Sequence, residues 1–205
     1  MKKLYQSEWS FFKENLLIKF GWIAILSFFF TELFYFSFLY NPEVMKEIMN
    51  SIVEKFQKEG LMDLQRKSSS LLAVKIFYVN LRSTFLFTVL AFLPFLLGSV
   101  LFFLMFPVLL GVTLASVITK GFDFSTFLKF TVPHGIFELA AVFYAVSLGV
   151  YVSLEITKKL FSQYKEKSAP FADLIKPVIR SYPLVIIPLL ALAALVEAFI
   201  TPLLK

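Results

Sequence analysis

Between Arg82 and Lys120 the chain carries no charged side chain, and this stretch is the strongest constraint on its fold. A helix needs about 20 mostly apolar residues to cross a bilayer, so the stretch is too long for one crossing and suits two. We expect spans at about residues 71–97 and 99–119, with Pro94, Gly98 and Ser99 as the turn between them. A pair of half-helices that enter and return is the alternative, because such backbone is tolerated where protein buries it.

The overall composition also indicates an integral membrane protein. Hydrophobic residues make up 59% of the chain, with 27 Phe, whereas about half of a soluble domain is apolar. The absence of Cys excludes disulfides and thiolate metal sites. The net charge of +6 lies beside the apolar runs, which favours lipid headgroups over nucleic acid as the partner. We expect one membrane domain over residues 1–205, with the lipid bilayer as its surroundings and no cofactor.

Three further apolar runs predict spans at about residues 17–40, 133–156 and 183–203, which gives an all-α polytopic bundle of about five transmembrane helices. Amphipathic segments accompany these spans. Residues 2–15 alternate apolar and charged side chains at helical spacing and are predicted to lie on the membrane surface. A basic connection over residues 158–182 contains another apolar stripe, which we expect to bend at Pro177.

A second amphipathic helix is predicted over residues 43–59, outside the bilayer. Asn41 and Pro42 provide a helix start, and Gly60 provides an end. The apolar stripe of this helix has two interpretations, since it could pack on its own protein or lipid, or it could receive a partner. In the second case Ile48, Ile52 and Phe56 would form the partner surface.

Orientation follows from the positions of Lys and Arg near the ends of the spans. The basic residues divide equally between the two sides, so the acidic residues over 43–63 decide the assignment. They dilute the positive charge of that side, which favours a multi-pass protein of the cell membrane with the N-terminus in the cytoplasm and the C-terminus outside.

Six polar side chains fall inside or close to the predicted spans. A helical rise of about 1.5 Å per residue puts them at a similar level, toward the side that holds residues 43–59. Each would be costly against lipid and tolerable against the others, so we expect them to converge inside the bundle. The predicted buried polar cluster consists of Glu32, Asn80, Arg82, His134, Glu138 and Glu197.

This cluster has three interpretations. In the structural one, Arg82 neutralises an acid such as Glu138, while Asn80 and His134 complete hydrogen bonds. In the second, the acids line a hydrated pocket or an ion pathway. The third is catalytic, with His134 as a general base oriented by Glu138. It is the weakest, because the spacing lacks the second histidine of a zinc site and no nucleophile stands in a recognised motif. We therefore expect neither catalytic nor metal-binding residues.

Two stretches carry a family pattern. One runs from Ile76 to Arg82, with Asn80 and Arg82 leading into an apolar run. The other comprises Pro133, His134, Gly135, Glu138, Leu139 and Gly149. Together they resemble the stage II sporulation protein M family of small multispan membrane proteins. The resemblance implies a scaffold for membrane or envelope proteins rather than a catalyst.

Three functions remain open at this point. The first is a non-enzymatic scaffold of membrane or envelope partners. The second is a transporter, channel or lipid-moving protein that uses the buried polar cluster, and the third is an intramembrane hydrolase. Small residues such as Gly98, Gly111 and Gly149 permit close helix contacts, which would serve internal packing or a homodimer equally well.

Overall fold

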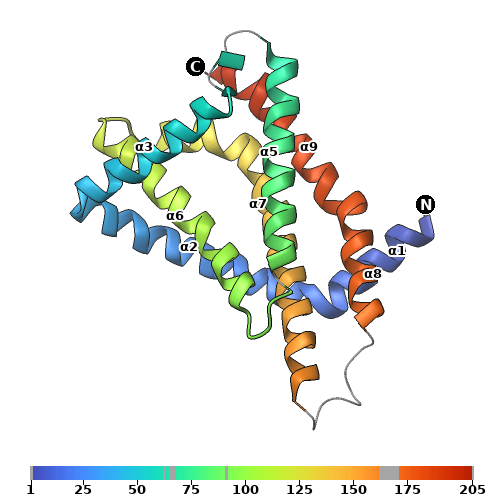
Figure 1. Cartoon of the computed structure of the whole chain (residues 1–205). Coiled ribbons are helices and arrows are strands. Elements are labelled where there is room, and N and C mark those ends of the chain that lie inside the picture. The colour runs from blue at the N-terminus through green and yellow to red at the C-terminus, as the bar shows by residue number, and fades with distance from the viewer. Residues whose placement is uncertain (1, 62, 65–67, 91, 162–170, 205) are drawn as a thin grey trace.

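The computed structural model describes residues 2–61, 63–64, 68–90, 92–161 and 171–204, and over these residues the chain is helical without strands. Five helical segments are long and apolar enough to cross a membrane, as the sequence predicted. Figure 1 shows the segments as a bundle in which the turn between α5 and α6 and the C-terminal end of α7 lie at one end. The C-terminal residues and helix α3 lie at the other end.

The first segment is one long helix. Helix α1 (Lys2–Phe11) continues through a π-helical turn (Phe12–Leu16) into α2 (Leu17–Tyr40). Residues 2–15 are therefore not a separate surface helix, although Leu4, Tyr5 and Trp9 are exposed as an amphipathic segment requires.

Helices α5 (Ser69–Leu90) and α6 (Leu97–Thr119) form the predicted pair of spans. The predicted span 71–97 is too long, since α5 ends at Leu90 and the turn lies before Gly98 and Ser99, which are buried within α6. Side chains of α7 hold this turn: Thr157 Oγ1 accepts a 2.8 Å hydrogen bond from the Phe95 amide, and Ser153 Oγ accepts one of 2.9 Å from the Leu96 amide. Both amides lie at the start of α6, where backbone N–H groups have no partner within the helix, so the side chains of α7 satisfy them.

Helix α7 (Phe124–Leu160) begins well before the predicted start at residue 133. Asp123 caps it by accepting a 2.8 Å hydrogen bond from the Thr126 amide, which sets the start at Phe124. Pro133 lies inside the helix rather than at its first turn. The path of α7 bends between its N-terminal part and its long C-terminal part (Figure 1). A proline inside a helix removes one backbone hydrogen bond and clashes with the preceding turn, which explains a bend here.

The last segment joins α8 (Phe171–Ser181) and α9 (Ile187–Leu195) through a π-helical turn at Tyr182–Ile186. Another π-helical turn (Val196–Ile200) and a short 3₁₀ helix (Thr201–Leu204) complete it. Residues 171–181 therefore extend the last span instead of forming a separate connection. Of the predicted basic connection over 158–182, residues 162–170 lie outside the described part of the chain.

Helix α3 (Pro42–Lys58) lies across one end of the bundle (Figure 1). Its apolar stripe packs against α2 and α6, with Met45 buried against Phe38 and Ala115. Ile48 and Ile52 pack against the same cluster, so they are not an open partner surface, whereas Phe56 is 44% exposed. The stripe thus packs on its own protein, the first of the two alternatives.

The core is centred on the C-terminal part of α7, where a continuous run from Ala141 to Gly149 is buried. Helices α2 and α6 pack closely beside it, and Gly111 of α6 lies at their crossing. This arrangement places the N-terminal part of α7, with Pro133 and His134, between α6 and the end of the last span.

The Asp123 cap gives a prediction with a defined pH dependence. Hydrogen bonds from Thr126 and Ser125 hold the pKa of the Asp123 carboxyl below its ordinary value of 3.8. The carboxylate therefore stabilises the fold fully above about pH 4, and this contribution is lost as the pH falls through the lower folded-state pKa. We expect Asp123→Ala to lower the melting temperature at pH 7 and to have less effect in strong acid.

The matched control is Asp123→Asn, because asparagine is also a good N-cap but does not titrate in this range. Its melting temperature at pH 7 should lie close to that of the native chain. If Asp123→Ala and Asp123→Asn melt at the same temperature at pH 7, the capping hydrogen bond is not stabilising.

Candidate functional site

Four of the six residues of the predicted polar cluster line one cavity of about 280 Å³. Asn80 comes from α5, His134 and Glu138 from α7, and Glu197 from the π-helical turn after α9. All four side chains are partly buried. Three segments far apart in the sequence thus bring their polar groups to one place, and Lys55 and Phe56 of α3 complete the wall.

The backbone explains why these side chains meet. His134 and Glu138 are four residues apart, so they lie on the same face of α7. They follow directly after the bend at Pro133, where the helix turns past the end of the last span. Helix α5 packs against that span through Leu72, Ala73, Ala194 and Ala198, which brings Asn80 beside Glu197 on the cavity wall.

The side chains in the cavity are weakly connected to one another. His134 Nδ1 lies 3.4 Å from Thr201 Oγ1, and Glu138 and Glu197 are two acids on the wall of the same cavity. No ion pair joins either acid to a cation in the part of the chain that the structure describes. The cavity volume is several times the roughly 30 Å³ that a water molecule occupies. Its carboxyl, imidazole and amide groups can therefore bind water or polar groups of a ligand.

Arg82 does not join this group. It lies on α5, exposed, and lines a neighbouring groove with Lys55 and Glu59. The prediction that Arg82 neutralises Glu138 is wrong for the described residues. Each residue of a helix is rotated by about 100° around the axis from the one before it. Arg82, two positions after Asn80, therefore faces a different side of α5.

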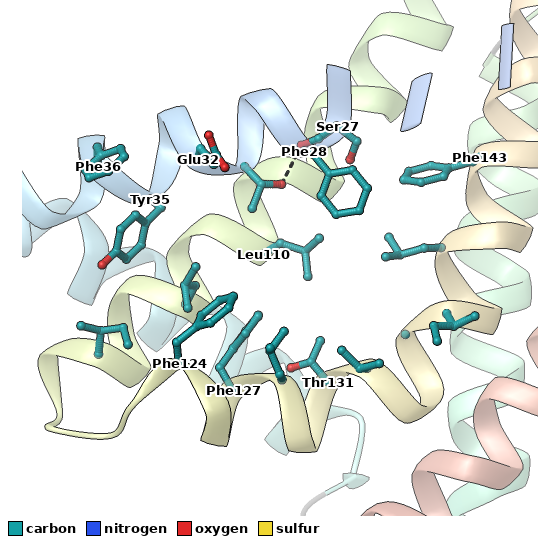
Figure 2. Close-up of a pocket in the computed structure, with 18 residues that line it drawn as sticks. Ser27, Phe28, Glu32, Tyr35, Phe36, Leu110, Phe124, Phe127, Thr131 and Phe143 are labelled. Carbon is teal, nitrogen blue, oxygen red and sulfur yellow. Dashed lines mark hydrogen bonds between the residues drawn. The ribbon is translucent and has the colours of Figure 1, made fainter. Parts of the chain in front are cut away.

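Glu32 does not join it either. It lies on α2, exposed, beside a different and largely apolar cavity of about 640 Å³. Figure 2 shows Glu32 on α2, across this cavity from Phe127 and Thr131 of α7. The depth of a residue in the membrane does not determine which way its side chain points around the helix. Depth alone therefore predicts Arg82 and Glu32 in the cluster, although both face other surfaces.

A second buried polar site was not expected from the sequence. Glu8 of α1 is 3% exposed and accepts hydrogen bonds from the Tyr144 hydroxyl, from Ser181 Oγ at 2.6 Å and from Arg180 Nε at 2.5 Å. Arg180 also donates a 2.8 Å hydrogen bond to Ser7 Oγ. The sequence does contain one indication, because Glu8 is four residues from both Leu4 and Phe12 and so lies on the apolar stripe.

Neither site has the composition of a metal centre. Among the described residues, no three His, Asp or Glu side chains are close enough together to hold a metal ion. The Glu8 site is a saturated network of donors around one carboxylate, which suits a structural role. Within the described residues, the cavity around Glu138 has polar groups without hydrogen-bond partners, and it is the better candidate for binding.

Five membrane-competent helices, four of which line a small polar cavity, define this chain as a polytopic helical membrane protein. The chain belongs to the stage II sporulation protein M family, whose family model matches residues 17–202. The predicted resemblance is thereby confirmed over nearly the whole chain. No curated protein and no solved structure matches it.

Proposed function

We propose that this protein is a non-enzymatic scaffold that organises membrane or envelope proteins, with α3 as its docking element. The observation that carries the proposal is the way α3 is held. Its apolar stripe is fixed on α2 and α6, while its opposite face is exposed and charged. A rigid helix that presents polar side chains at the end of a membrane bundle suits recognition by another protein. That face consists of Glu43, Lys46, Glu47, Asn50 and Glu54.

Family membership supports this role and does not favour the transporter, channel or lipid-moving alternative. In the proposed topology the N-terminus is cytoplasmic, so that α3 and the C-terminus lie outside. The partners are then proteins of the membrane or of the envelope, and a second copy of the chain is the homodimer alternative.

Site-specific photocrosslinking in native membranes tests the proposal. A photoreactive residue at Glu47 faces outward and should give one dominant, saturable adduct with another membrane or envelope protein. The matched control is Met49, two positions away on the same helix, which packs against α2 and α6. We expect little or no adduct from position 49.

Excess unlabelled protein should suppress the adduct from position 47, because it competes for the same partner. Equal adducts from positions 47 and 49, or none from either, would contradict docking on the charged face of α3. An adduct with the mass of two chains would identify the partner as a second copy.

A further inference from the structure

A groove beside the polar cavity combines two cations with an apolar wall. It has a volume of about 490 Å³ and runs between α3, α5 and α6. Lys55 of α3 and Arg82 of α5 both line it, and neither forms an ion pair within the described residues. Two unpaired cations from separate helices produce a positive region that attracts a negatively charged group.

The rest of the groove has an apolar, exposed wall. Leu86 and Leu90 lie four and eight residues after Arg82, on the same side of α5, and reach about 6 and 12 Å further along the helix. Both are exposed, as is Met105 of α6 on the facing wall. One end of the groove is therefore bordered by α3 and charged, and the rest offers an apolar strip to the bilayer.

A third polar group refines the chemistry of the ligand. Glu59 lines the same groove, and its Oε2 atom is buried without a hydrogen-bond partner in the described structure. A buried carboxylate oxygen requires a donor. The charges of Lys55, Arg82 and Glu59 sum to one net positive charge, which matches a ligand with one negative charge and a hydroxyl donor.

We propose that this groove binds an anionic phospholipid with a hydroxyl-bearing headgroup, of the phosphatidylglycerol class. The phosphate lies at Lys55 and Arg82, a headgroup hydroxyl donates to Glu59, and one acyl chain follows Leu86 and Leu90. The proposal does not depend on the scaffold function, because it concerns a different face of the molecule.

Native mass spectrometry of the purified full-length protein tests this with added phosphatidylglycerol or phosphatidylcholine of identical acyl chains. We expect phosphatidylglycerol to be retained preferentially. The double variant Lys55→Ala/Arg82→Ala should weaken its binding by about tenfold or more, because each cation near a membrane surface contributes appreciably to binding an anionic lipid. The matched control is Lys120→Ala, which removes an exposed cation at the end of α6, outside the groove.

A second variant tests the apolar half of the site without changing charge. Leu86→Trp fills the strip beside Leu90, and since Leu86 is 50% exposed the fold should tolerate it. We expect it to expel the lipid although both cations remain. Equal retention of the two lipids, or unchanged binding in both variants, would overturn the proposal. A dimer that Leu86→Trp dissociates would also overturn it, because a second copy would then be the occupant.

Discussion

Glu8→Ala is expected to destabilise the protein by about 3 kcal/mol, the lower part of the range for breaking a buried ion pair. Glu8 has a side chain that is 4% exposed, and Arg180, its ionic partner, is 26% exposed. The substitution leaves the Arg180 guanidinium without its counter-charge and removes the acceptor of the Tyr144 and Ser181 hydroxyls. The lower value is expected because Arg180 keeps partial access to water. Denaturant unfolding in detergent micelles measures the change.

The matched control is Glu14→Ala, which removes an exposed acid from the same helical segment and should change stability by less than about 0.5 kcal/mol. A double-mutant cycle with Arg180→Ala tests the pairing itself. Once Arg180 is absent, Glu8→Ala should cost clearly less than it does in the native chain. If Glu8→Ala and Glu14→Ala unfold at the same denaturant concentration, the network does not hold α1 to α8.

The partners of Glu8 could not be predicted from the sequence, although the five crossings could. The apolar runs predicted five crossings because hydrocarbon permits few alternatives to a helix. The partners of Glu8 are Tyr144, Arg180 and Ser181, more than 130 positions away in sequence, and only tertiary packing brings them together. The family model begins at residue 17, so the match does not include Glu8 either.

The polar cavity was partly predictable for a related reason. The spacing of His134 and Glu138 fixes their common face of α7, and the cost of polar groups in lipid predicts that they face protein. Helix rotation is set by packing, and it directs Arg82 and Glu32 to other surfaces. Helix α7 is longer than the predicted span 133–156, because the Asp123 cap starts it at Phe124, nine residues before Pro133.

Gly111→Ala is expected to destabilise the protein by about 2–3 kcal/mol, as overpacking of a closely packed site does. A Cβ atom at Gly111 would lie 2.8 Å from Phe34 Cβ, 3.0 Å from the Tyr35 amide nitrogen and 3.1 Å from the Thr31 carbonyl oxygen. Two of these atoms belong to the α2 backbone and the third is bonded to it, so no side-chain rotation relieves the contact. The helices α2 and α6 must move apart instead.

Gly21→Ala is the matched control, because it makes the same change within α2 where, apart from the adjoining backbone of the same helix, no described atom lies within 4 Å of the new Cβ. Alanine is favoured over glycine in a helix by about 0.5–1 kcal/mol, so this variant should be neutral or slightly more stable. Unfolding of both variants under the same conditions separates helix propensity from contact at the α2–α6 crossing. If Gly111→Ala is as stable as Gly21→Ala, the two helices do not approach as closely as described. Helix α3 packs on this same pair of helices. The pair would then hold α3 less firmly than the proposed scaffold role requires.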